Sequence, residues 1–149
     1  MDRTYVTEND AGRARLDALV SRLSDDEFAV RMGGWTIGVG LMHLAFWDRN
    51  WLAKFEEWER TGAVVVPDVG YQRDLFNGIN DAMVHWWRSA APVQVRHEVL
   101  AAAEAIDKKA RGLPEWLVEA IMTERPRTLV RAVHRGEHLD EIERALVKQ

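Results

Sequence analysis

The stretch His134–Leu146, HRGEHLDEIERAL, carries two histidines, His134 and His138, four residues apart on what its periodicity predicts to be a C-terminal helix. Residues at this spacing share one helix face with Cβ atoms about 5–6 Å apart, so two neutral imidazoles can reach one metal ion. Apolar residues recur at helical spacing around the pair, namely Val130, Val133, Ile142 and Ala145. This pattern predicts that both imidazoles face an apolar arc.

A third candidate ligand lies far upstream, because His43 occurs in GGWTIGVGLMHLAFWD on another predicted helix. A closed fold would have to bring it to the pair. The alternative for the pair is a solvated or hydrogen-bonded helix face without metal. The same letters also match H-x-x-E-H, the signature of inverzincin proteases, in which Glu137 would be the general base. Only eleven residues follow His138, which leaves little chain for a distal ligand, so we reject that interpretation.

The composition predicts one globular domain over residues 1–149. Of its 149 residues, 47% are hydrophobic and 30% charged, which is ordinary for a globular protein, and the net charge is −4. A nucleic-acid surface needs a basic face, and no cluster of lysine and arginine with interleaved aromatic residues occurs, so we expect no nucleic-acid partner. The absence of cysteine excludes thiolate ligands and a cysteine nucleophile, so any thiol chemistry needs an external thiol.

The N-terminal stretch MDRTYVTENDAGRARL is charged and lacks the apolar core of a signal peptide. No segment approaches the roughly 18–20 apolar residues that a membrane span requires. We therefore expect a cytoplasmic protein without a membrane partner.

Apolar periodicity and helix-boundary signals predict an all-α fold, a four-helix bundle with short additional helices. Ser24 with Glu27 matches a capping box, and Thr36 can cap the helix that carries His43. The segment Gly62–Tyr71, GAVVVPDVGY, is the only plausible strand material, but Pro67 splits it and we expect a loop. The expected helices run from about Thr7 to Leu23, 24–31, 36–60, 72–90, 93–111, 115–122 and 127–147.

The order of four motifs resembles the DinB/YfiT-like metalloenzyme superfamily. These motifs are GGWT, HLAFWD seven residues after Thr36, DLFN at Asp74–Asn77 and the terminal HxxxHLDEI. The resemblance implies a four-helix bundle with up-down-down-up topology, which dimerises in family members. It also implies that His43, His134 and His138 are the metal ligands. Activities in the family include thiol-dependent S-transferases and isomerases that use low-molecular-weight thiols, and hydrolase-like members.

Three histidine ligands would leave an open coordination position, as in catalytic rather than structural sites. A water there can have its pKa lowered toward about 7, or a substrate thiolate or carbonyl can bind instead. Zinc and nickel best suit the three nitrogens, with manganese and iron as further candidates.

Three carboxylates are candidates for orienting the imidazoles or acting as general base, namely Asp48, Glu137 and Asp140. Surface ion pairs are the alternative role for them. Three tryptophans are candidates for lining a substrate pocket, although each can equally be core: Trp47, Trp51 and Trp86. Of the other histidines, we expect His85 to pack in the core and His97 to lie on a solvated face.

Two functional hypotheses follow. The first is a divalent-metal-dependent enzyme, a thiol-dependent transferase or isomerase or a hydrolase, acting on a small molecule. The second is a stress-response protein that binds or sequesters a small molecule without turnover. An apolar pocket says little about the group that enters it, so the substrate stays open.

Overall fold

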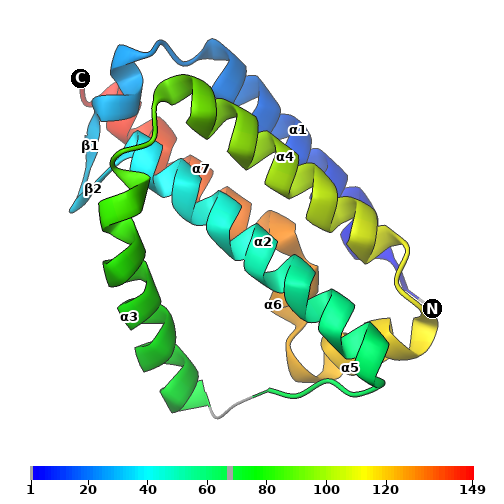
Figure 1. Cartoon of the computed structure of the whole chain (residues 1–149). Helices are drawn as coiled ribbons and strands as arrows, with labels where there is room; N and C mark the ends of the chain where they lie inside the picture. Colours follow the sequence, from blue (N-terminus) through cyan, green and yellow to red (C-terminus); the bar gives the residue numbers. More distant parts are fainter. Residues whose placement is uncertain (1, 67–68) are drawn as a thin grey trace.

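The computed structural model describes residues 2–66 and 69–149, and most of the described chain is helical (Figure 1). This confirms the predicted all-α class. The elements are α1 (Thr4–Arg22), a 3-10 turn η1 (Asp26–Ala29), β1 (Arg31–Met32), β2 (Trp35–Thr36), α2 (Ile37–Thr61), α3 (Val69–Trp87), α4 (Pro92–Arg111), α5 (Glu115–Glu124), α6 (Pro126–Leu129) and α7 (Arg131–Val147).

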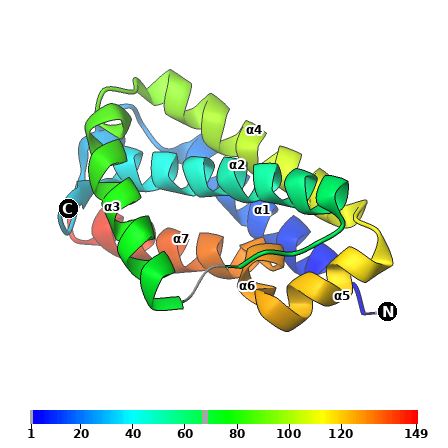
Figure 2. The ribbon, with the colours of Figure 1, turned by 60° about the horizontal axis from the view of Figure 1, so that its bottom comes forward.

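Four long helices, α1, α2, α4 and α7, pack side by side and enclose the core. In Figure 1, α2 and α4 run in one direction, whereas α1 and α7 run in the opposite direction. The remaining long helix, α3, crosses the outside of α2 and carries the chain back to the start of α4 (Figure 2). Among the described residues, no helix is long and apolar enough to cross a membrane.

Caps explain most of the helix boundaries. The Thr36 hydroxyl accepts a hydrogen bond from the Val39 amide at 3.2 Å, and Gly62 closes α2 in the left-handed conformation at φ 75°. Both boundaries were predicted. The start of α1 was predicted three residues too late, at Thr7, because the Asp2 carboxylate accepts a hydrogen bond from the Thr4 amide at 2.8 Å and lets the helix begin there.

The capping box of Ser24 and Glu27 is confirmed, with reciprocal backbone-to-side-chain hydrogen bonds of 2.9 and 3.3 Å. It starts only the short turn η1, not a helix up to Arg31. β1 and β2 follow as an antiparallel hairpin, with Arg31 opposite Thr36 and Met32 opposite Trp35. Its tight turn uses Gly33 at φ 65°. The strands thus lie upstream of the segment that had been the only strand candidate.

The connection between α2 and α3 is a loop over residues 63–66, as predicted, while Pro67 and Asp68 lie outside the described residues. The α3 helix begins at Val69 and ends at Trp87, three residues before the predicted end at Ala90. The Ser89 hydroxyl explains this end, because it donates a hydrogen bond to the Trp86 carbonyl at 2.7 Å and replaces a helical partner.

The predicted C-terminal helix from Arg127 to Val147 is interrupted at Val130, which has φ −85° and ψ 76°. Asn9 of α1 occupies the break. Its side-chain amide donates to the Leu129 carbonyl at 2.9 Å and its side-chain oxygen accepts from the Ala132 amide at 3.0 Å. One buried asparagine therefore satisfies both backbone groups that the break releases, which fixes where α7 begins.

The core consists of two apolar clusters with a polar layer between them. One cluster lies near the hairpin and contains Leu16, Leu41, Leu44, Val99 and Ile142, and the other contains Phe55, Trp58, Ile106, Leu117 and Leu129. On α2, Asp48 lies between Ala45 of the first cluster and Phe55 of the second, and on α4, Asp107 follows Ile106, where the second cluster begins.

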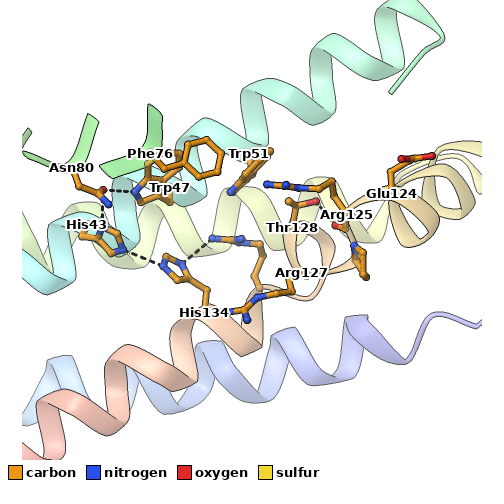
Figure 3. A pocket seen from close by; sticks show the side chains of 12 residues that line it. His43, Trp47, Trp51, Phe76, Asn80, Glu124, Arg125, Arg127, Thr128 and His134 are labelled. Carbon is orange, nitrogen blue, oxygen red and sulfur yellow. Dashed lines mark hydrogen bonds between the residues drawn. The ribbon is translucent and has the colours of Figure 1, made fainter. Parts of the chain in front are cut away.

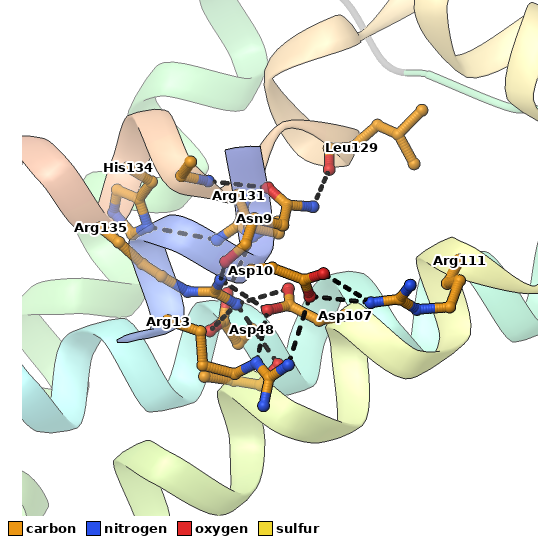
Figure 4. A network of polar contacts seen from close by, with 12 residues as sticks. Asn9, Asp10, Arg13, Asp48, Asp107, Arg111, Leu129, Arg131, His134 and Arg135 are labelled. Carbon is orange, nitrogen blue, oxygen red and sulfur yellow. Dashed lines mark hydrogen bonds and ion pairs between the residues drawn. The ribbon is translucent and has the colours of Figure 1, made fainter. Parts of the chain in front are cut away.

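The polar layer is a buried ion-pair network that joins the four long helices (Figure 4). Arg135 of α7 is fully buried and donates to both carboxylate oxygens of Asp107 at 2.8 Å, and to Asp48 at 3.2 Å. The Asp48 carboxylate also accepts from Arg131 Nε at 2.8 Å. From α1, Arg13 Nε donates to Asp107 at 3.1 Å.

We expect Asp107→Asn to lower the free energy of unfolding by about 3–5 kcal/mol, because it leaves the buried Arg135 charge without its bidentate partner. Asp140→Asn is the matched control, since Asp140 pairs with Arg15 at the surface, and it should cost at most about 1 kcal/mol. Denaturant unfolding of both variants measures the difference. Equal stability losses would contradict a structural role for the network.

Candidate metal centre

The structure brings His43, His134 and His138 together, with one ligand nitrogen of each within 4.8 Å of the others. His43 comes from the first half of α2, and the other two lie one turn apart on α7. The distances between the ring centres are 4.7–5.1 Å. The three imidazoles therefore form one compact group between two helices.

A third helix fixes the orientation of the His43 ring. The Asn80 side-chain oxygen of α3 accepts hydrogen bonds from Trp47 Nε1 at 2.8 Å and from His43 Nδ1 at 3.1 Å. Because the indole nitrogen can only donate, it identifies the acceptor atom of Asn80 and hence the proton on His43 Nδ1. The lone pair of His43 Nε2 is thus directed at the other histidines, which is the state that a metal ligand requires.

In the His134 ring, the hydrogen bonds place the proton on the other nitrogen, Nε2. Arg131 Nη2 lies 3.2 Å from His134 Nδ1, and a guanidinium can only donate, so Nδ1 accepts. A neutral ring then carries its proton on Nε2 and donates to His43 Nε2 at 3.1 Å. The result is a continuous chain of hydrogen bonds from Trp47 to Arg131 in which every donor meets an acceptor.

His138 is the unsatisfied member of the group. Its Nδ1 is buried without a hydrogen bond, because the nearest carboxylate oxygen, Glu141 Oε2, lies 3.5 Å away without hydrogen-bond geometry. The ring stacks on Trp35 of β2, with centroids 6.5 Å apart. A buried imidazole with an orphaned nitrogen beside two others is a donor set that fits a late divalent ion.

Burial keeps the group neutral. It lowers the pKa of His43 from 6.5 to about 4, with a smaller contribution from the neighbouring His138. Burial likewise lowers the pKa of His134, where the nearby Arg131 charge adds to the shift, and the pKa of His138. Neutral imidazole is the form that binds metals, so the site needs no proton removed from a charged ring at neutral pH.

None of the three candidate carboxylates contacts the histidine rings. Asp48 is held in the buried ion pairs with Arg131 and Arg135, and it reaches His134 only through Arg131. The Glu137 side chain is 51% exposed and pairs with Arg127, and the Asp140 side chain is 56% exposed and pairs with Arg15. The structure therefore places these three carboxylates in ion pairs rather than against the rings, and their role as a general base stays a prediction. The position of Glu137 also removes the base of the inverzincin interpretation.

The aromatic predictions are corrected in part. Trp47 and Trp51 line the cavity beside the histidines, but Trp86 is 70% exposed and does not. Its neighbour Trp87 is buried instead, with its ring centre 5.7 Å from that of His43. His85 is exposed rather than packed in the core.

The histidines border a cavity of about 480 Å³ (Figure 3). His43, His134 and Asn80 form one end of it, and the segment that joins α5 to α6 forms the other. Asn80 and Arg125 were missed in the sequence. For Asn80 a signal existed, because it lies four residues after Phe76 and so on the same face of α3.

The DinB superfamily model matches residues 8–142 of the chain. The match covers most of the sequence, and the chain belongs to the DinB superfamily, as its motifs had indicated. No curated protein and no solved structure matches the chain.

Arg131→Gln should strengthen zinc binding by roughly tenfold, the scale on which groups that orient ligands act. The glutamine side-chain oxygen can accept a hydrogen bond from a protonated His134 Nδ1, which leaves the lone pair of Nε2 for the ion, and the substitution removes a positive charge beside the site. A chelator competition assay measures the affinity.

Arg127→Gln is the control for charge, because Arg127 lines the same cavity but pairs with Glu137 and makes no contact with the rings. Its zinc affinity should stay within about twofold of the wild type. Weaker zinc binding by Arg131→Gln than by the control would show that Arg131 supports the ligand.

Proposed function

We propose that the chain is a divalent-metal-dependent enzyme in which His43, His134 and His138 hold the ion and the adjoining cavity receives a small molecule. The observation that carries this proposal is the convergence of three neutral imidazoles, one buried and two half-buried, of which His43 and His134 line one end of a cavity of about 480 Å³. We further propose that the four long helices form an up-down-down-up bundle, which the directions of α1, α2, α4 and α7 support.

Thiol-dependent transfer is the reaction class that the surroundings favour. Asp48, Glu137 and Asp140 are engaged in ion pairs with arginines, and the carboxylate nearest a ring is that of Glu141, which lies 3.5 Å from His138 Nδ1 and would orient that imidazole rather than act on a reactant. If His43, His134 and His138 held a divalent ion, it would supply Lewis-acid activation that lowers the pKa of a thiol from its usual value of about 8.5, so that the thiol could release its proton to solvent at neutral pH without a protein base. Because the chain has no cysteine, the thiol would be a separate small molecule.

In this scheme the residues of the chain position and enclose the reactants. Asn80 and Trp47 hold His43 with its Nε2 lone pair directed into the group. Trp47, Trp51 and Phe76 wall the cavity and exclude water from the reacting atoms. The ion would be zinc or nickel, for which three imidazoles are suitable ligands.

A binding protein without turnover is the second candidate. The ion pairs that occupy Asp48, Glu137 and Asp140 favour it, since sequestration of a small molecule needs no proton acceptor.

We expect nearly one zinc or nickel ion per chain after reconstitution, and loss of most of it in His43→Ala and in His138→Ala. His97→Ala is the control, since His97 is exposed and lies outside the group. Plasma mass spectrometry of dialysed, untagged protein gives the metal content. Retention of the ion in both ligand variants would contradict the site.

The same samples decide between the two candidates. Metal-loaded wild type should accelerate the reaction of glutathione or cysteine with chlorodinitrobenzene, and His43→Ala should not. A protein that holds its metal but consumes no thiol with any electrophile tested would favour the binding function.

A further inference from the structure

Arg125, between α5 and α6, is a cation without an anionic partner. Its guanidinium lies over the Trp51 ring, 5.7 Å from the centroid. Apart from this contact, the guanidinium group forms no hydrogen bond or ion pair with any residue that the structure describes. The other two arginines at the cavity are neutralised, Arg127 by Glu137 and Arg131 by Asp48. Among the described lining residues, Arg125 is therefore the positive charge of the cavity without an ion-pair partner, and it is already half-buried.

Arg125 lies where two spaces in the protein meet. It lines the cavity that ends at His43 and His134, and also a neighbouring apolar groove of about 430 Å³ between α2 and α3. Trp47, Trp51 and Phe76 are shared in the same way, so the two spaces adjoin at this residue.

The groove itself is apolar. Its walls include Trp58, Leu75 and Ile79, and its one acidic residue, Glu57, pairs with Lys54 at 2.8 Å. On the side of the histidines, Glu124 points away from Arg125 in Figure 3. No carboxylate of the described lining residues is thus in a position to neutralise Arg125.

We propose that the cavity binds an organic anion with an apolar tail, whose carboxylate pairs with Arg125 while the tail enters the groove between α2 and α3. A guanidinium presents two parallel donors that match a carboxylate, and Trp51 behind it keeps the fork in place. The tail is apolar in this proposal because its burial against the aromatic walls removes apolar surface from water, which favours binding. The reacting part of the molecule would then face His43 and His134, and this last step rests on the proposed metal-dependent function.

The test uses the full-length protein after removal of metal by a chelator, so that an anion cannot bind to an ion instead. Calorimetric titration compares phenylbutyrate with its neutral amide and with butyrate. Phenylbutyrate should bind about tenfold or more tightly than either, because the amide lacks the charge and butyrate lacks the ring. Arg125→Gln should abolish the preference over the amide, and Arg125→Lys should retain part of it.

Two further variants control the interpretation. Arg127→Gln removes a charge whose partner is Glu137, and it should keep the preference for the anion. Leu75→Ser changes the groove alone, so it should weaken phenylbutyrate and leave butyrate unchanged. The proposal is overturned if the wild type binds phenylbutyrate no more tightly than its amide. It is also overturned if folded Arg125→Gln keeps the preference for the anion.

The result separates this inference from the proposed function. Anion binding that depends on Arg125 in a protein that takes up no metal would refute the enzyme but support the ligand class. Stoichiometric zinc without any preference for the anion would refute the ligand class and leave the metal site intact.

Discussion

The bidentate pair between Arg135 and Asp107 is the interaction on which the rest of the structure depends. It links α7 to α4, and the shared partner Asp48 extends the link to α2. Because a buried charge without a partner is expensive, these helices can pack in only one register. That register is also what sets His134 and His138 of α7 opposite His43 of α2.

The network contributes specificity more than stability. Burial raises the pKa of the Asp107 carboxyl even though Arg135 opposes the shift, which means that the charged form is costly in this layer. An apolar layer of similar volume would hold the helices together at least as well, but it would permit them to slide. A change of one residue in the register of α7 would combine a translation of about 1.5 Å with a rotation of about 100°, which would turn both of its histidines away from His43. The ion pairs therefore serve the geometry of the site.

The three-histidine group could be predicted from the sequence because it depends on local spacing and on a family pattern, whereas its surroundings depend on tertiary contacts. Asn80 meets His43 only because α3 crosses α2, and Asn9 interrupts the last helix from a distance of 120 residues. The error at Trp86 has a simpler origin. Adjacent residues on a helix differ by about 100° in direction, so without the phase of α3 the sequence could not distinguish exposed Trp86 from buried Trp87. The surroundings of the three candidate carboxylates could not be predicted for a related reason, because arginines from other elements pair with them.

Two of the three rings in the histidine group are joined by a hydrogen bond. His43 accepts from His134, which accepts from Arg131, and only His138 retains an orphaned nitrogen. An ion held by all three rings would need the His134 nitrogen that faces it to be unprotonated, and the hydrogen bond from Arg131 to Nδ1 of the same ring influences which nitrogen carries the proton. Arg131 is in turn held by Asp48, so the buried network that aligns the helices also sets the electrostatics of the histidines. Position and affinity at this site are consequently controlled by the same few charges, and a substitution in the polar layer should change both together.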